Sequence, residues 1–442
     1  MAVRRASGRV ADENPLIGDR RQLVVLVAFK DRSFKEKNPL ALWDRVFNEV
    51  GFSESDFKGS VRDYFYDQSY GQFRLTFDTY HVTLADNCSK YHSNEDDDEN
   101  SKYLVADVVD SLLKRHLDWS PYDWDGDGYV DQLLILYAGK GMNDGGGDNS
   151  IWPHQYRMSW HGTELPEVPA GARTLKVDSY CCIQEITRSG SYGVFGTICH
   201  EYSHCFGLPD FYNGSILYVG TWDLMDYGNN NGSGYCPPGY SAHERMLMGW
   251  LTPVELKEPA DINQMAALSD EPIAYLIRND GYSQEYYIVE NRQKSGWDSQ
   301  LPGSGIVVFH VDYDEKEWLF GVPNSNNRKR YTIFPANNKT SRTSANGWSY
   351  PYLGNDSLTN HSLPAATLLN ANTDGKKLMS KPLTAMSVAN GLASFTFMNP
   401  TLAAIHEHSV LPGNGKVLYN FGPFSIIRRP DGTVGKCLMK RP

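Results

Sequence analysis

The apolar positions of the first 250 residues follow two different periods. A nearly continuous apolar run of β-forming side chains at 22–29 predicts a strand that is covered on both faces. The segments 40–50 and 101–113 carry apolar side chains one helical turn apart, which predicts amphipathic helices. The strand pattern returns at 72–82 and 130–138. This alternation predicts an α/β layer, with helices packed on a mixed sheet.

A helix start is also readable just before the strand at 72–82. Ser60 is followed three positions later by Asp63, and at this spacing each side chain can bond the other residue's backbone N–H. We therefore expect Ser60 to cap a helix whose aromatic side chains, Tyr64 and Phe65, pack inward.

After Trp250 the helical period is lost. Short β-rich segments at 273–278, 285–290 and 305–311 are separated by clusters of Gly, Pro, Asn and Ser, which predicts a second domain built like a sandwich. The Asn- and Ser-rich stretch 324–360 is expected to be mostly loop.

The length of 442 residues exceeds what one core usually supports, so we expect two domains. The last residues contain Pro430-Asp-Gly432, which is typical of a hairpin turn, but no readable chemistry. The predicted boundaries are a tail at 1–18, the α/β domain at 19–252, the β-rich domain at 253–400 and a tail or hairpin at 401–442.

Composition argues against two classes of partner. A net charge of −11 is unsuited to nucleic acid, whose binding needs clustered Lys and Arg. No apolar run approaches the ~18 residues needed to cross a bilayer. The start, Met1-Ala-Val-Arg-Arg-Ala-Ser7, lacks the apolar core of a signal peptide, so we expect a mature form behind an added start codon. Oligomeric state cannot be read from the sequence.

Seven cysteines make an odd number without a C-x-x-C pair, so no disulfide scaffold is predicted. Cys181 and Cys182 are adjacent in an extended segment and should face opposite ways. Cys199 and Cys205 flank two histidines, but six residues on a helix place them on different faces. We expect both to be small buried packing residues rather than metal ligands.

The segment with the most specific chemistry is Ile198-Cys-His-Glu-Tyr-Ser-His-Cys-Phe-Gly-Leu-Pro-Asp210. His200 and His204 stand four residues apart, so on a helix they project from one face and can close on a single ion, as in zinc sites. Glu201 lies about a hundred degrees around the helix from His200 and can reach a metal-bound water. The alternative is an ordinary polar helix face, which the Gly and Asp that follow make less credible.

Gly207 and Pro209 predict that the helix ends directly after the second histidine. A Gly can take the left-handed conformation at a helix C-terminus, and a Pro prevents the helix from resuming. Such a turn would fold Asp210 back beneath the helix as a third ligand and leave the fourth position for water. An open position of this kind indicates catalysis.

The segment Gly220-Thr-Trp-Asp-Leu-Met-Asp-Tyr-Gly228 resembles the tight turn that lies under the metal in the zinc peptidases called metzincins. On that resemblance Met225 lies beneath the zinc, and Tyr227 contacts the metal or the transition-state oxygen. The alternative for Met225 is ordinary core filling.

Further segments, in the same order along the chain, resemble the immune inhibitor A family of secreted zinc metallopeptidases. Each motif is soft, but the order is hard to imitate, and the resemblance covers roughly residues 20 to 320. Family members often carry Gly and an acidic residue at the positions of Ser203 and Cys205, and an acidic residue at that of Phe211. The matching segments are 23–31, 59–65, 151–154, the zinc helix, 244–250, 290–292 and 305–312.

The resemblance implies an α/β catalytic domain of the zincin type, a twisted mixed sheet with an active-site helix, followed by the β-rich domain. It also implies a protein that is secreted, at the cell surface or periplasmic, and that acts as an endopeptidase on extracellular proteins. Glu201 is expected to take a proton from the zinc-bound water and deliver it to the leaving amine, with zinc and Tyr227 stabilising the oxyanion.

The substrate is expected to be a protein or peptide, bound extended along an exposed sheet edge within 175–186. Two alternatives stay open. One is a zinc-dependent amidase acting on a non-protein or cell-wall amide, and the other is an inactive zinc-containing binding module. Glu201 argues against the inactive module, because a structural zinc site needs no base.

A second acidic cluster precedes the strand at 130–138. The segment Asp123-Trp-Asp-Gly-Asp-Gly-Tyr-Val-Asp131 offers carboxylates at alternate positions, and Gly128 permits a sharp bend, so it resembles a calcium-binding loop. Leu134 stands where such a loop has a bidentate Glu. An Asp-capped turn that binds nothing is the alternative to a Ca²⁺ site formed by Asp123, Asp125, Asp127 and Asp131.

The other histidines carry less information. Trp152 and His154 could lie near the cleft, but a packed imidazole with a satisfied nitrogen is the favoured interpretation. His310 lies in an apolar strand and is expected to be structural.

Overall fold

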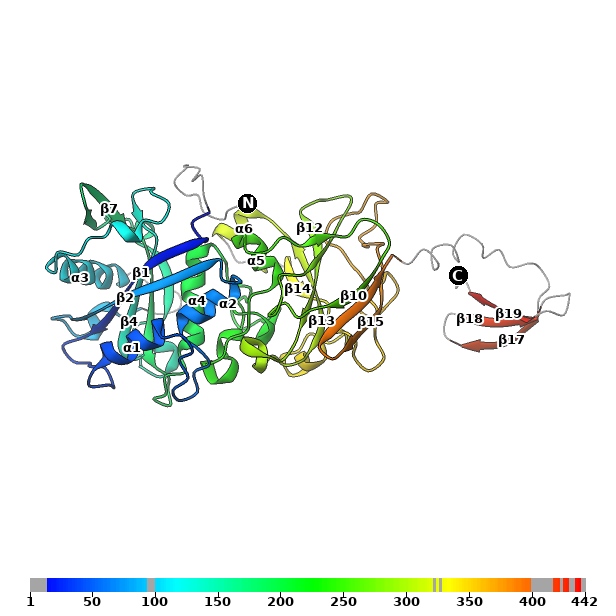
Figure 1. The fold of residues 1–442 in the computed structure, drawn as a ribbon, viewed down its shortest axis with the longest axis horizontal. Helices are drawn as coiled ribbons and strands as arrows, with labels where there is room; N and C mark the ends of the chain where they lie inside the picture. The colour runs from blue at the N-terminus through cyan, green and yellow to red at the C-terminus, as the bar shows by residue number, and fades with distance from the viewer. Residues whose placement is uncertain are drawn as a thin grey trace.

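The main sheet of the N-terminal half has the strand order β2-β1-β4-β8-β5 in a computed structural model (Figure 1). The first four of these strands are parallel, and β5 runs antiparallel to β8. The strands are β1 (Gly18–Ala28), β2 (Phe73–Thr83), β4 (Leu133–Lys140), β5 (His154–Arg157) and β8 (Ser179–Ile186). The described residues are 14–93, 100–320, 323–325, 328–398, 416–421, 424–428 and 434–438.

Alternate residues of each central strand face the two layers of helices. Val24 and Leu26 of β1 belong to the apolar cluster on one face, whereas Leu23, Val25 and Val27 belong to the cluster on the other. This confirms the prediction of a strand that is covered on both faces. The first face packs against α1 (Pro39–Asn48), α2 (Val61–Gln68) and α4 (Phe195–Ser203), and the second against α3 (Ser101–Leu113).

Three local predictions are confirmed. Ser60 caps α2, since Asp63 N donates to Ser60 Oγ at 3.1 Å and Ser60 N donates to Asp63 Oδ2 at 2.9 Å. Tyr64 and Phe65 are fully buried. Cys181 and Cys182 lie in the clusters on opposite faces of the sheet. The six cysteines whose side chains the structure describes, Cys199 and Cys205 among them, are buried and form no disulfide.

Two details of the sequence interpretation were wrong. The strand expected at 130–138 is split, because β3 (Tyr129–Val130) pairs with β7 (Arg173–Val177) in a small sheet that also contains β6 (Glu167–Ala170). The expected free edge within 175–186 is largely covered, because β7 lies between β3 and β6, and β5 pairs with 179–182 of β8. Only 183–186 extend beyond the end of β5.

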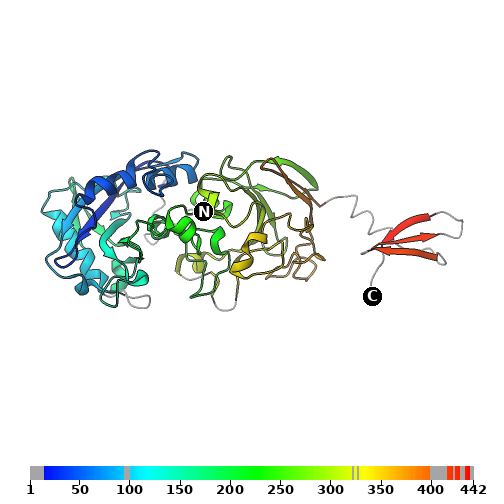
Figure 2. The same cartoon turned by 90° about the horizontal axis from the view of Figure 1, so that it is seen from below.

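The residues after Trp250 form β-sheets, as predicted (Figures 1 and 2). One sheet has the order β14-β13-β12-β11-β9 and another the order β10-β16-β15. The strands are β9 (Val254–Glu255), β10 (Ala260–Met265), β11 (Tyr275–Arg278), β12 (Glu285–Arg292), β13 (Gly305–Asp312), β14 (Tyr331–Ile333), β15 (Leu383–Ala389) and β16 (Leu392–Phe397).

The stretch expected to be loop at 324–360 contains β14, which pairs antiparallel with β13. The prediction missed it because the strand is three residues long and gives no readable period. Farther along, β17 (Lys416–Phe421), β18 (Phe424–Arg428) and β19 (Val434–Leu438) form a small antiparallel sheet. The predicted turn Pro430-Asp-Gly432 lies outside the described residues.

The apolar core is continuous across position 252. One face of the sheet β14-β13-β12-β11-β9, with Ile288 and Phe309, belongs to the same apolar cluster as helix α4 and Met225. The opposite face of this sheet, with Val289 and Val308, packs in a second cluster with residues of the sheet β10-β16-β15. The predicted boundary at 252 and the sandwich architecture stay predictions, but contacts across this boundary connect the β-rich part to the predicted metal helix. Among the described residues, no helix is long and apolar enough to span a bilayer.

We predict that the β-rich part loses stability in acid through Glu285. His310 Nε2 donates to its carboxylate at 2.7 Å and Asn370 N at 3.0 Å. Burial opposes ionisation, but the hydrogen bonds from His310 and the backbone outweigh it and lower the pKa of Glu285 to about 2. This acid therefore stabilises the fold fully above pH ~4.5, on the order of 3 kcal/mol, and the contribution is lost as pH falls toward 2.

The measurement is the free energy of unfolding of the parent protein and of Glu285→Gln between pH 7 and pH 3. The difference between them should be largest at neutral pH and should shrink below pH ~4.5. Glu258→Gln, at an exposed position, serves as the control. A difference that stays constant with pH would contradict this assignment.

Candidate metal centre

The segment that carries the two histidines begins as helix α4 and ends in a tighter turn. The α-helix stops at Ser203, and 204–206 continue as one turn of 3₁₀ helix. Gly207 follows in the left-handed conformation with φ of +83°, and its N–H donates to His204 O at 2.9 Å. The predicted helix end at Gly207 is thus confirmed.

Asp210 folds back onto the histidines. Its Oδ1 lies 3.1 Å from His200 Nε2 and 3.6 Å from His204 Nε2. Ligands at ~2.0–2.1 Å around a tetrahedral ion are separated by about 3.4 Å, so these two distances match the edges of such a ligand set. The Oδ1 atom is buried and accepts no hydrogen bond of good geometry, although the Asp210 side chain is 28% exposed. Two nitrogens and an oxygen without a hydrogen bond therefore fit a divalent cation.

Both imidazoles are held by backbone carbonyls on the side away from this centre. His200 Nδ1 lies 2.9 Å from Leu224 O, and His204 Nδ1 lies 2.7 Å from Leu208 O. Because a carbonyl can only accept, each Nδ1 must carry the proton, and in the neutral ring Nε2 then has a free lone pair. Both Nε2 atoms face Asp210, so both rings present a donor atom that can bind a metal.

The turn around Met225 provides two of the backbone contacts of the centre. Leu224 O accepts from His200, and Met225 O accepts from Phe211 N at 2.9 Å, directly after Asp210. Met225 is fully buried in the apolar cluster that contains α4. The turn therefore contacts both the first histidine and the segment of Asp210, and the Met225 side chain also fills the core.

The charged groups of the centre shift one another's pKa values. Burial opposes protonation of His200, but Asp210 and Glu201 outweigh it and raise the pKa of His200 to about 9. Burial lowers the pKa of His204. Burial acts to raise the pKa of Asp210, but the two histidines outweigh it and lower that pKa. Without a metal, a proton on His200 therefore neutralises one of the two carboxylates.

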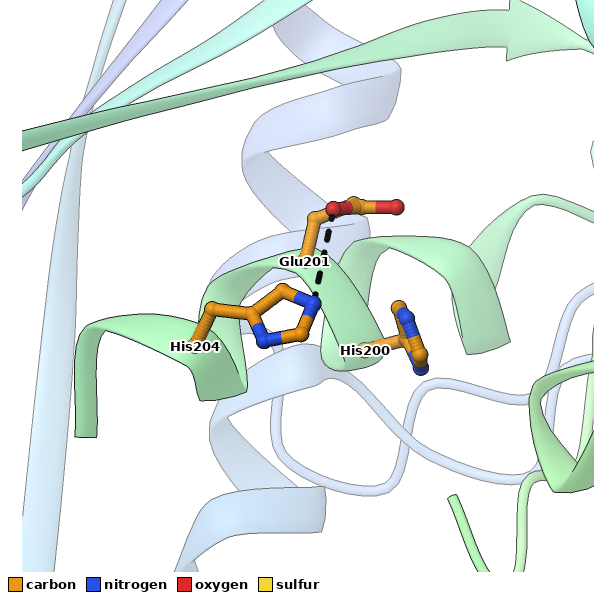
Figure 3. Close-up of side chains that lie close together, drawn as sticks. All are labelled: His200, Glu201 and His204. Atoms are coloured by element: carbon orange, nitrogen blue, oxygen red, sulfur yellow. Dashed lines mark ion pairs between the residues drawn. The ribbon is translucent and has the colours of Figure 1, made fainter. Parts of the chain in front are cut away.

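Glu201 lies beside the imidazoles of His200 and His204 (Figure 3). Its Oε2 is 4.0 Å from His204 Nε2. One carboxylate oxygen of Glu201 and one ring nitrogen of each histidine all lie within 4.8 Å of one another. The side chain is 11% exposed. This distance leaves room for a water between the carboxylate and a cation held by His200, His204 and Asp210.

The ring of Tyr227 contacts Arg342, whose guanidinium lies 3.9 Å from the ring centre. No described contact joins Tyr227 to the histidines, so its predicted role stays a prediction. A different tyrosine lies at the centre. The Tyr212 ring stacks on His200 with centroids 6.3 Å apart, and its hydroxyl is hydrogen-bonded to Asp210. Its position two residues after Asp210 was the available sequence signal.

Three of the four acidic residues of the predicted calcium loop come together. Carboxylate oxygens of Asp123, Asp125 and Asp127 lie within 4.8 Å of one another. Both oxygens of Asp123 are buried without a well-formed hydrogen bond, and burial raises its pKa. Asp131 instead accepts from Trp124 N, so its carboxylate caps the loop. Gly128 has φ of +93°, which agrees with the sharp bend expected there.

Both ring nitrogens of His154 and the Nε2 of His310 have hydrogen-bond partners. His154 Nδ1 lies 2.7 Å from Trp152 O and Nε2 lies 3.2 Å from Tyr180 Oη, beside the face of the sheet opposite α4. Burial lowers the pKa of His154 to about 4. His310 pairs with Glu285. The structural interpretation of both is confirmed, and Trp152 contributes its backbone carbonyl.

Comparison with known proteins finds similarity to one family of peptidases. The profile of the immune inhibitor A peptidase M6 catalytic domain matches residues 21–248. Immune inhibitor A of Bacillus thuringiensis subsp. alesti is 29% identical over 169 residues, which cover 32% of this chain and 24% of that protein. Pre-pro-metalloprotease PrtV of Vibrio cholerae serotype O1 (strain M66-2) is 26% identical over 275 residues, 51% of this chain and 29% of that protein. The chain thus matches less than a third of the length of either relative.

We predict that Gly196 is required for the close approach of α4 to the segment after Met225. A Cβ added at Gly196 would lie 1.9 Å from the backbone oxygen of Asn229. The backbone would have to move, so Gly196→Ala should lower the free energy of unfolding by roughly 1–3 kcal/mol. Thr197→Ala, at the next and only part-buried position, should change it by less than about 0.5 kcal/mol. Equal effects of the two substitutions in denaturant unfolding would contradict the prediction.

Proposed function

The chain belongs to the immune inhibitor A peptidase M6 family of metallopeptidases, and we propose that it is a zinc-dependent endopeptidase. The observation that carries the proposal is the convergence of His200 Nε2, His204 Nε2 and Asp210 Oδ1. Two imidazoles and one carboxylate with room for a fourth ligand are typical of catalytic zinc. We propose these three residues as the ligands.

In this proposal Glu201 is the general base. When bound, zinc lowers the pKa of a water to about 7 and polarises the scissile carbonyl. Glu201 accepts a proton from the attacking water and later delivers it to the leaving amine, without a covalent enzyme intermediate. Its place on α4 supports the role, because Glu201 Oε2 lies 4.0 Å from His204 Nε2 and so beside the proposed ligand atoms.

Tyr212 and the Met225 turn are proposed to hold the ligands. The hydrogen bond from Tyr212 occupies part of the Asp210 carboxylate and so limits its rotation. Leu224 O fixes the ring of His200. Tyr227 is proposed, as expected from the resemblance, to help the zinc stabilise the oxyanion.

We propose an extracellular protein or peptide as the substrate, bound extended, and a secreted location. The end of β8 that β5 leaves unpaired, residues 183–186, offers no open edge, because Ile183 and Glu185 are fully buried, so extended binding is proposed without an assigned strand. The alternatives are a cell-wall amidase and an inactive zinc-binding module. Digestion of a diverse peptide library, with and without a zinc chelator, separates the three, because only an endopeptidase gives chelator-sensitive cleavage of many peptides.

We predict that Glu201→Gln retains zinc but loses at least 10²–10⁴-fold in kcat, because Gln cannot accept the proton. Asp210→Asn should instead weaken zinc binding. The measurements are turnover of a cleaved peptide and zinc content after dialysis. Glu185→Gln is the matched control, since Glu185 is a fully buried acid on β8 whose carboxylate bonds backbone N–H groups of Lys35 and Gly139. Retained activity in Glu201→Gln would refute its role as base.

We also propose that Asp123, Asp125 and Asp127 bind Ca²⁺, with Asp131 shaping the loop. The buried oxygens of Asp123 support this, because a bound cation would offset their desolvation more fully than the exposed Arg173 guanidinium, which lies 3.5 Å from Asp123 Oδ2. We predict that Ca²⁺ at 100 times its Kd raises the stability of the catalytically inactive Glu201→Gln protein by about 2.7 kcal/mol. Asp125→Asn should abolish the increase and Asp374→Asn, an exposed acid elsewhere, should not. If Ca²⁺ does not change the unfolding midpoint, the Asp-capped turn that binds nothing is the correct interpretation.

A further inference from the structure

The residue after Asp210 is held by the β-rich part of the chain. Phe211 O accepts from Asn324 Nδ2 at 2.8 Å, and Phe211 N donates to Met225 O at 2.9 Å. Asn324 is 1% exposed. Both backbone polar groups of Phe211 are thus fixed, one by the Met225 turn and one by a side chain more than a hundred residues away.

Tyr331 of β14 makes the second connection. Its ring stacks on Phe211 with centroids 3.9 Å apart. Its hydroxyl lies 3.0 Å from Asp223 Oδ2, and Asp223 Oδ1 accepts from Met225 N at 2.8 Å. Asp223 and Tyr331 are both fully buried. The phenol therefore contacts the segment of Asp210 through its ring and the Met225 turn through its hydroxyl.

Asn324 and Tyr331 also hold each other. Asn324 Nδ2 donates to Tyr331 O at 2.9 Å, and Tyr331 N donates to Asn324 Oδ1 at 2.9 Å. Because the Asn324 side chain is paired with the backbone of Tyr331, the two residues are fixed relative to each other. We call the pair the β14 clamp, and a shift of β14 would move both of its contacts with the metal centre together.

We propose that Asn324 and Tyr331 are positioning residues for the metal centre. They hold the backbone beside Asp210 and the turn whose Leu224 carbonyl orients His200, so they arrange two of the three ligands before a metal binds. The inference rests on the proposed function, because it takes Asp210 and His200 as zinc ligands. Partners that hydrogen-bond a metal ligand directly typically contribute 10–100-fold to metal affinity, and Asn324 and Tyr331 act through the two segments that carry or orient the ligands.

The experiment measures zinc affinity of the full chain by competition with a chromophoric chelator. Tyr331→Phe keeps the ring on Phe211 and removes the hydroxyl, and Asn324→Ala removes all three hydrogen bonds of the side-chain amide. Tyr287→Phe is the matched control, because Tyr287 is 1% exposed on β12 and donates to Thr367 O at 2.6 Å, within the β-rich part. Asn291→Ala is the second, since its buried amide donates to Met265 O and Gly391 O.

We expect Tyr331→Phe and Asn324→Ala to weaken zinc binding roughly 10-fold or more and the two controls to change it less than about twofold. The absorption spectrum of the Co²⁺-substituted protein should change in the first pair only. The unfolding midpoint of the metal-free protein is measured in parallel, because a merely structural role lowers the midpoint and leaves zinc affinity unchanged.

Three results would overturn the inference. These are unchanged zinc affinity in a folded Tyr331→Phe, unchanged affinity in a folded Asn324→Ala, or an equal loss in the matched controls. Failure of the parent protein to bind one zinc would instead refute the proposed function itself. Because the parent protein is measured first, the two failures are distinguishable.

Discussion

The chemistry available at the metal centre depends on two hydrogen bonds from imidazole N–H groups to backbone carbonyls. Leu208 O and Leu224 O each occupy an Nδ1, so each ring must present Nε2 to the interior of the site. Without them a neutral histidine could carry its proton on either nitrogen, and the ligand lone pair could face away from Asp210. The two histidines, which the helix places on one face, can therefore both offer Nε2 to a metal only because each Nδ1 carries the proton.

The two carbonyls differ in how far along the chain they come from their histidines. Leu208 is four residues after His204, so the end of the helix supplies its own partner once Gly207 has turned the backbone. Leu224 is 24 residues from His200 and reaches it only if the Met225 turn lies under α4. That turn is held by Asp223, by the close approach at Gly196 and by the β14 clamp. The first histidine is thus oriented by the tertiary fold and the second by local structure.

This difference explains what the sequence could predict. The helix, the left-handed Gly207 and the return of Asp210 follow from spacing and backbone rules within about ten residues, and the structure has them. The alternating faces of β1 were likewise readable from local apolar runs. The contacts of Asn324 with Phe211 and of Tyr331 with Asp223 were missed, because they join segments more than a hundred residues apart. Strand β14 was missed because three residues give no readable period. The pairing of β5 with the edge of β8 was missed for a similar reason, because the hydrophobic period of a strand does not reveal which strands are its neighbours in the sheet.

The charges of the site favour a divalent cation over a proton or a monovalent ion. With both imidazoles neutral, Asp210 and Glu201 bring two negative charges into a largely buried space, which is costly in a medium of low dielectric constant. Protonation of His200, whose pKa these carboxylates raise to about 9, compensates only one of them. A doubly charged ion compensates both and also uses the lone pairs of both Nε2 atoms. In the proposed mechanism, Glu201 is then left ionised beside this ion, in the state that a general base requires.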